Sequence, residues 1–290
     1  MRLGVMATIK HILFPFDFSQ QGVLAAPFVR AAAQRLQAQV TLLGVVPPVW
    51  DVPVAGMPAV MVDTVEMERG MELRLEKALT KELEGLDIQR ETRAGDPALQ
   101  ITEFADENRA DLIMMPTHGC GLFRSLLIGS VTSKVLHDAK CPVWTATHAE
   151  EQRSPATPRV ILCAVDGTAK TPALMQWAAG YARQMGSSLR LLHVVPRISD
   201  WLALQEEREL QEQVRDEARA KLEAHTLSAG VDAPVRIAVG SVSTTVTEEA
   251  RQEGADLVII GRGTLQAPFG RLRTHAYGIV QAAPCPVLSV

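Results

Sequence analysis

The chain of 290 residues is 47% apolar and 21% charged, with a formal net charge of -4. This length predicts two domains or one large one, and the hydrophobicity with low net charge excludes an intrinsically disordered protein. The acidic balance and the small aromatic content (7 Phe, 4 Trp and 2 Tyr) argue against a nucleic-acid-binding protein, which needs a basic surface and rings for stacking.

In the first half of the chain, short apolar runs alternate with amphipathic helical patterns. The predicted strands cover residues 9–15, 39–46, 86–93, 111–116 and 141–146, and the predicted helices cover residues 20–37, 64–84, 97–109 and 129–138. The strand runs are continuously apolar, which is typical of strands covered on both faces. This alternation predicts a parallel sheet connected by right-handed crossovers.

The second half of the chain shows the same alternation. Its predicted strands cover residues 159–165, 188–195, 233–239, 256–261 and 285–290. A long helix is expected over residues 200–228, where Leu210, Val214, Ala218 and Leu222 recur every fourth residue on an otherwise charged surface.

Four sequence landmarks of the first half recur in the second half, in the same order and at nearly constant spacing. They are an apolar run ending at Asp17 or Asp166, the segments 42–47 and 191–196, the segments 110–115 and 255–260, and the Cys-Pro-Val triplets at 141–143 and 285–287. The chain is therefore a tandem duplication. We predict an α/β fold with two doubly wound parallel five-stranded sheets, in domains 1–147 and 159–290 joined by a polar linker over 148–158.

Ligands of open parallel sheets bind beyond the carboxyl ends of the strands, so the residues that follow each strand are candidates. Asp17 follows the first strand, where it is either a turn or capping residue or part of a binding site. Gly129 and Ser130 open the helix after the fourth strand, where backbone N–H groups and the helix dipole favour an anion. The hydroxyls of Ser130 and Thr132 are expected to donate to phosphate oxygens.

These pieces together resemble the universal stress protein family, whose ATP-binding members carry Gly-x2-Gly-x9-Gly-Ser/Thr after the fourth strand. The first half has Pro116 in place of the first glycine, then Gly119, nine residues, and Gly129-Ser130. The segment Ile12–Ser19, the triplet Thr117-His118-Gly119 and the closing Cys141–Val143 are also similar to this family. The resemblance spans the whole chain in two copies and implies the adenine nucleotide alpha hydrolase-like fold.

The resemblance also implies a set of ATP-binding residues. Pro15, Phe16 and Asp17 would form the adenosine end, and Val45 would pack against the base, with Met115 on the same side. Thr117, His118 and Gly119 would flank the phosphates, and Gly129, Ser130, Val131 and Thr132 would hold them from the helix start. The expected cofactor is ATP, with or without Mg, and no catalytic residue is assigned.

The second half departs from this motif. One residue fewer separates the two glycines after its fourth strand, Gly261 and Gly263, and Arg273-Thr274 stands where the family spacing requires Gly-Ser/Thr. Arg271 and Arg273 either pair with acidic groups in an inactive site or bind a different anion. We predict that the second half binds ATP weakly or not at all.

Three further features of the sequence concern a metal site, a long loop and the edges of the sheets. His118, Cys120, His137 and Cys141 lack the complete spacing of a zinc site, so no metal site is predicted. The Pro-rich segment Pro47–Asp63 either covers the nucleotide, covers a dimer surface or packs on its own domain. The fifth strands would be exposed sheet edges, which an intramolecular pseudo-dimer of the two domains or a homodimer would cover.

Four cysteines without a CxxC pair, no signal peptide and no apolar run of transmembrane length predict a cytoplasmic protein without a membrane partner. The expected function is ATP binding in a stress response, with the nucleotide setting conformation or association. The alternatives are a slow ATP hydrolase or another nucleotide-using enzyme of this fold, and a scaffold with vestigial pockets.

Overall fold

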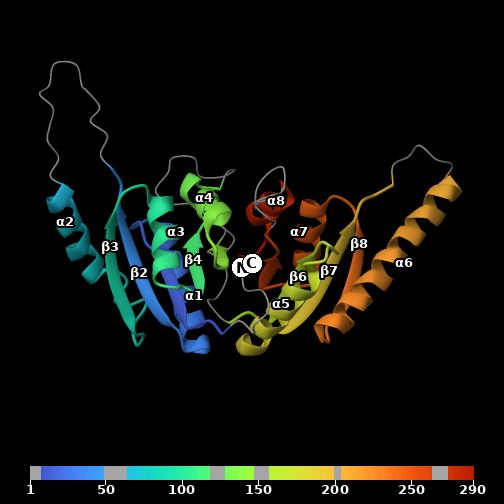
Figure 1. The fold of residues 1–290 in the computed structure, drawn as a ribbon, viewed down its shortest axis with the longest axis horizontal. Coiled ribbons are helices and arrows are strands. Elements are labelled where there is room, and N and C mark those ends of the chain that lie inside the picture. Colours follow the sequence, from blue (N-terminus) through green and yellow to red (C-terminus); the bar gives the residue numbers. More distant parts are fainter. Residues whose placement is uncertain (1–7, 49–63, 118–127, 147–156, 199–203, 263–273) are drawn as a thin grey trace, which may run out of the picture. The chain divides into compact units, whose positions relative to one another are not determined.

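The computed structural model describes residues 8–48, 64–117, 128–146, 157–198, 204–262 and 274–290 (Figure 1). The chain divides into two compact units, one formed by Ile9–Cys141 and the other containing Pro142–Val290.

The first unit is a parallel sheet of four strands in the order β3-β2-β1-β4. Its strands are β1 (His11–Pro15), β2 (Gln39–Val46), β3 (Ile88–Ala94) and β4 (Leu112–Pro116). Its helices are α1 (Gln20–Leu36), α2 (Thr64–Lys77), α3 (Pro97–Glu107) and α4 (Ser130–Asp138). The strand order places β1 at the centre, between β2 and β4.

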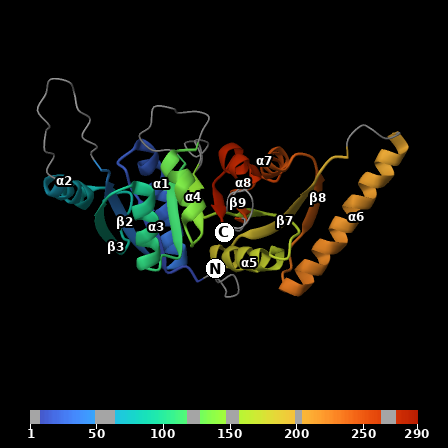
Figure 2. The same ribbon diagram turned by 45° about the horizontal axis from the view of Figure 1, so that its top comes forward.

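The second unit has the strand order β5-β10-β9-β6-β7-β8. Its strands are β5 (Val143–Ala146), β6 (Val160–Val165), β7 (Ser188–Val195), β8 (Val235–Val239), β9 (Leu257–Ile260) and β10 (Val287–Ser289). Its helices are α5 (Thr171–Met185), α6 (Leu204–Ala229), α7 (Val242–Gln252) and α8 (Thr274–Ala282). Helices α5 and α6 pack together, and so do α7 and α8 (Figure 2).

The predicted α/β fold with parallel strands is confirmed, and the fifth strand of the first repeat is the exception. β5 runs antiparallel to β10, with Trp144 opposite Leu288 and Thr145 opposite Val287. The Thr145 hydroxyl also donates to the carbonyl of Val287 at 3.2 Å. The two strands expected at exposed edges thus satisfy each other's backbone groups, and β5 belongs to the unit of the second repeat.

Burial along the strands follows their position in the sheet. All five residues of β4 are buried, as are four of the five in β1. The residues of the outer strand β3, which pairs only with β2 within its unit, are half-buried or exposed, and none is buried. The continuous apolar pattern therefore identified the central strands correctly.

Helix α2 ends earlier than the predicted helix over residues 64–84. It stops at Lys77, and Leu79 adopts a left-handed backbone with φ of 53°. The following turn still buries Leu79 and Leu83, so the apolar periodicity continues beyond the end of α2. Periodicity alone cannot separate a helix from a compact turn that buries the same side chains.

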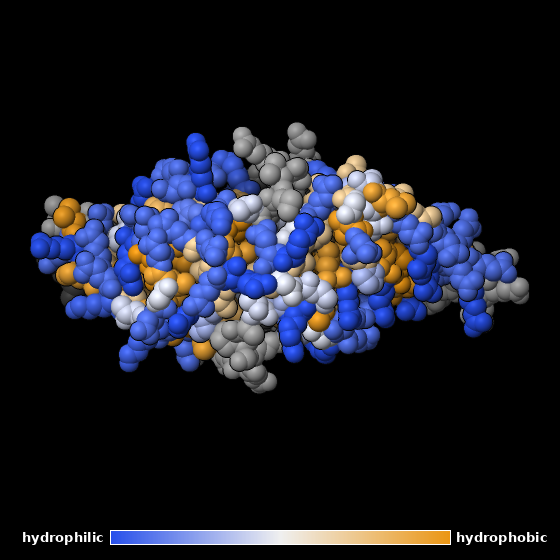
Figure 3. Space-filling model, turned by 90° about the horizontal axis from the view of Figure 1, so that it is seen from below, coloured by the Kyte–Doolittle hydropathy of each residue, from blue (hydrophilic) through white to orange (hydrophobic). Residues whose placement is uncertain are grey.

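Among the described residues, no helix is both long and apolar enough to cross a membrane. In the view of Figure 3, hydrophilic residues cover most of the described surface and apolar areas lie between them. Exposed large apolar side chains include Val65 and Leu73 on α2 and Leu227 on α6.

Candidate functional site

The loop between β1 and α1 is held by its own side chains. The Asp17 carboxylate accepts a hydrogen bond from the Ser19 backbone N–H at 3.0 Å, and the Ser19 hydroxyl accepts one from the N–H of Gly22 at 3.1 Å, which caps α1. Phe18 adopts a φ of 60°, which turns the chain sharply between the two. Asp17 is exposed at the carboxyl end of β1, where the sequence predicts the adenosine end of a nucleotide site.

Phe16 packs against the residues of this loop and against α1. Its N–H donates to the carbonyl of Leu43 at 2.9 Å, so the chain leaving β1 remains beside β2. Its ring is 5% exposed and lies 4.9 Å from the ring of Phe18, centroid to centroid. A Cβ atom at Gly22 would lie only 2.8 Å from this ring. Phe16 therefore has a packing role that fixes where Asp17 lies.

The sequence did not single out Arg74, whose guanidinium carbon lies 4.1 Å above the centre of the Phe18 ring. This cation–π contact joins α2 to the Asp17 loop and places a positive charge beside it. The sequence of α2 does not indicate this contact. Several charged residues share the helix with Arg74, and the pattern predicts that all of them are exposed to solvent.

Pro15, Val45 and Met115 are brought to the same edge of the sheet by strand order. Pro15 ends β1 and pairs in register with Leu43, two residues before Val45 near the end of β2. Met115 lies near the end of β4, on the other side of β1. Val45 is half-buried and Met115 is 5% exposed. The predicted base-contacting residues thus come from neighbouring strands, on either side of Pro15.

The residues on either side of 118–127 meet at the start of α4. The N–H of Gly129 donates to the carbonyl of Thr117 at 2.9 Å. The hydroxyl of Thr132, a residue only 3% exposed, donates to the carbonyl of Pro116 at 3.0 Å. The sequence predicted that this hydroxyl donates to a phosphate, but its single hydrogen is donated to the Pro116 carbonyl. Any contact of Thr132 with an anion would therefore use its backbone N–H.

Helix α4 begins without a side-chain cap, because its N-cap residue is Gly129. The N–H groups of Ser130, Val131 and Thr132 lie in the first turn, where a helix offers no internal acceptors. Ser130 is exposed and Val131 half-buried. This turn can therefore hold an anion through backbone groups and the helix dipole. His118 and Gly119 lie outside the described residues.

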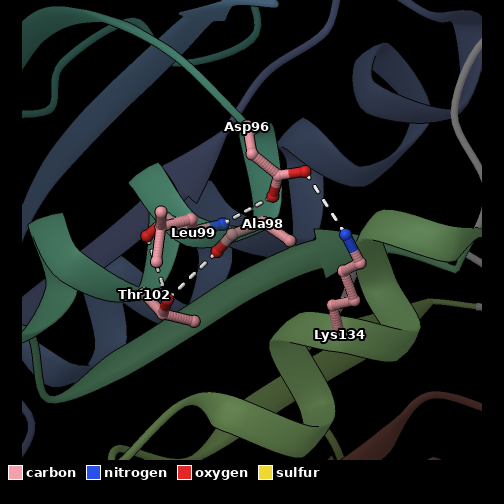
Figure 4. A network of polar contacts seen from close by, with 5 residues as sticks. All are labelled: Asp96, Ala98, Leu99, Thr102 and Lys134. Carbon is pink, nitrogen blue, oxygen red and sulfur yellow. Dashed lines mark hydrogen bonds and ion pairs between the residues drawn. The ribbon is translucent and has the colours of Figure 1, made fainter.

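Helices α3 and α4 are linked beside this turn (Figure 4). One Asp96 carboxylate oxygen caps α3 by accepting from the N–H of Leu99 at 3.0 Å, and the other accepts from Lys134 of α4 at 3.3 Å. The backbone N–H of Leu99, followed by Lys134, holds the pKa of Asp96 below its usual value. Thr102 donates to the carbonyls of Ala98 and Leu99 one turn earlier. Asp96 thus caps α3 and forms an exposed charge pair with α4.

The matching loop of the second half is built in a similar way. Asp166 accepts hydrogen bonds from the N–H and the hydroxyl of Thr168 and from the hydroxyl of Thr171. Arg271 and Arg273 lie outside the described residues. Among the residues that the structure does describe, no group of three or more His, Cys, Asp or Glu side chains could hold a metal ion.

Comparison with known proteins identifies both repeats. The model of the universal stress protein family matches residues 8–146 and again 158–290. A universal stress protein of Methanocaldococcus jannaschii is 36% identical over 140 residues, which is 46% of this chain and 79% of that protein. One from Mycolicibacterium smegmatis is 26% identical over 98% of both chains.

The fold of the whole chain also has a solved counterpart. The crystal structure of a universal stress protein from Archaeoglobus fulgidus has a TM-score of 0.67 and 20% identity, over 98% of this chain and 97% of that one. At this identity the likeness concerns the fold, and it includes both repeats. The chain therefore belongs to the universal stress protein family, in a tandem arrangement of two domains.

Proposed function

We propose that the first half binds ATP at the carboxyl ends of β1, β2 and β4, and that the bound nucleotide sets the protein's conformation or association in a stress response. The observation that carries this proposal is the uncapped start of α4 at Gly129, which is tied to the end of β4 by the Gly129–Thr117 hydrogen bond. This turn offers several backbone donors to a phosphate chain while the neighbouring strand ends supply an apolar wall.

The residues of this site fit a nucleotide without a dedicated metal cluster. Ser130 is exposed at the helix start, and Asp17 is exposed at the other end of the site. A Mg ion, if used, would arrive with the phosphates and take most of its ligands from them and from water. No catalytic residue is assigned to this site, so binding rather than hydrolysis is the proposed activity.

The substitution Gly129→Arg tests the placement, because it puts a long side chain where the backbone must approach a phosphate. We expect ATP affinity, measured by calorimetry on the full chain, to fall at least about tenfold, the loss of roughly one charge-assisted hydrogen bond. Gly70→Arg is the matched control, since a Cβ at Gly70 in α2 meets no atom within 4 Å. Equal ATP affinity in the Gly129 variant and the control would refute this site.

Mass spectrometry of nucleotide carried by the purified chain separates the alternatives. Retained ATP supports a nucleotide-binding stress protein, and ADP that accumulates with time supports a slow hydrolase. A chain that neither retains nor binds ATP supports the third alternative, a scaffold with vestigial pockets.

A further inference from the structure

The second unit contains a cavity of about 490 Å³ within its own repeat. It lies at the carboxyl ends of β6, β7 and β9 and reaches the first turns of α7 and α8. Its walls are mainly apolar and include Leu174, Leu192, Val246, Ile260 and Ile279. This volume and lining are typical of pockets that enclose a small organic molecule.

His193 of β7 is a polar residue of the cavity wall. Its imidazole is half-buried, and its Nδ1 atom lies 2.8 Å from the carbonyl oxygen of Val165. Because a carbonyl oxygen only accepts hydrogen bonds, Nδ1 carries the hydrogen, and in the neutral ring Nε2 is then an acceptor. Among the described residues His193 makes no second hydrogen bond, so Nε2 can accept one from a ligand.

The imidazole of His193 also lies against the turn that follows β6. A Cβ atom at Gly167 would lie 3.4 Å from its Cε1 atom and 3.8 Å from its Nε2 atom. In the matching segments 42–47 and 191–196 of the two repeats, His193 stands where the first repeat has Gly44, which has no side chain. This acceptor is therefore specific to the second repeat.

The other polar side chains of the lining are engaged with the protein or exposed. The hydroxyls of Thr168 and Thr171 both donate to the carboxylate of Asp166. Asp166 and Arg262 have further interactions of their own. The exposed charged or titratable members without such interactions are Lys170 and His275. A charged ligand would lose its water among apolar walls, which is costly, so the cavity suits a neutral ligand.

We propose that this cavity binds a small neutral molecule with an apolar body and one N–H or O–H group, which donates a hydrogen bond to Nε2 of His193. The apolar walls enclose the body of the ligand, and the hydrogen bond orients it. The cost of burying a charge disfavours a carboxylate or a phosphate in the same place. This site is separate from the ATP site proposed for the first half and takes a different class of ligand.

Indole, benzofuran and indole-3-carboxylate are suitable probes, because benzofuran has an oxygen in place of the indole N–H and the third compound adds a charge. Methyl NMR on the full chain, titrated without nucleotide at about pH 8, reports where each probe binds. We expect indole to shift the methyl signals of Ile260 and Ile279, and the other two probes to bind at least about fivefold more weakly. Absent indole shifts, or equal affinity for either of the other probes, would overturn the proposal.

The variant His193→Leu tests the acceptor by removing Nε2 while keeping an apolar side chain. The ratio of the affinities for indole and benzofuran should fall about fivefold, which is the effect of losing one neutral hydrogen bond. His137→Leu, in α4 of the first unit, is the matched control and should keep the ratio of the unaltered chain. An unchanged ratio in His193→Leu would refute the role of this residue.

The variant Val242→Trp tests the cavity itself and does not depend on the folding of His193→Leu. A larger side chain at this lining position should fill the cavity and abolish the indole shifts. Adenosine serves as a competing ligand of another class. If adenosine shifts the signals of Ile260 and Ile279 at lower concentrations than indole, the cavity is a nucleoside site and the proposal is wrong. Because these titrations contain no ATP, their outcome is independent of the site proposed for the first half.

Discussion

Asp17 and Asp166 occupy matching positions in the two repeats and accept matching hydrogen bonds, from the N–H groups of Ser19 and Thr168, two residues later. Each carboxylate therefore shapes the turn that follows the first strand of its repeat. The sequence left open whether this aspartate is structural or functional. The structure shows the structural role in both repeats, and in the first repeat the same turn presents Asp17 at the proposed adenosine end.

Asp96 allows a test at the scale of one residue. Replacing it by alanine removes the acceptor for the Leu99 N–H, and we expect a loss of about 1 kcal/mol in the free energy of unfolding at neutral pH. The half-exposed pair with Lys134 contributes less, because solvent screens it. Asp96→Asn is the control, since an asparagine oxygen can still cap α3.

The effect of Asp96→Ala should also depend on pH. The pKa of Asp96 is lowered in the folded chain, so its stabilisation is fully present above the unfolded value near 3.8 and disappears as pH falls through the folded value. Urea unfolding at neutral pH and at about pH 3 checks this, because the difference between wild type and Asp96→Ala should shrink in acid. A difference that is the same at both pH values would contradict the assigned role.

At the scale of elements, the packing of α1 against the end of β1 depends on Gly22. The missing side chain lets α1 approach the buried ring of Phe16. We expect Gly22→Ala to lower the free energy of unfolding by about 1–3 kcal/mol, because neighbouring rings on both sides prevent Phe16 from moving. Gly70→Ala, in open space on α2, should instead be neutral or stabilising by about 0.5–1 kcal/mol. Urea midpoints that do not separate these two variants would show that this contact is unimportant.

The sequence predicted each element of the first unit, because continuous apolar runs and helical periodicity are local signals. The resemblance to the universal stress protein family implied that Pro15, Val45 and Met115 lie at one site, and the strand order brings them to the same edge of the sheet. The Arg74–Phe18 and Asp96–Lys134 contacts were not predicted. They join residues far apart in sequence, and nothing in a charged helix face indicates which charge will meet which partner.

At the scale of the whole molecule, duplication has produced two units with different chemistry. Backbone N–H groups at the start of α4 carry the site proposed for the first half, whereas the second half has Arg262 in place of Thr117. The sequence pointed to this asymmetry through the altered glycine motif. It did not reveal the pocket at the carboxyl ends of β6, β7 and β9, because that pocket is lined by residues far apart in the sequence.

The assignment of β5 to the second unit can be tested in the full chain by Thr145→Pro. Proline removes a backbone N–H and disfavours the paired strand, so the β5–β10 ladder should open. We expect faster amide hydrogen exchange, measured by mass spectrometry, in β10, with β2 and β3 unchanged. Thr92→Pro in β3, which pairs with Gly44 of β2, is the matched control and should produce the opposite pattern. Unchanged exchange in β10 after Thr145→Pro would mean that β5 does not hold this edge, and the second repeat would then need another cover for its last strand.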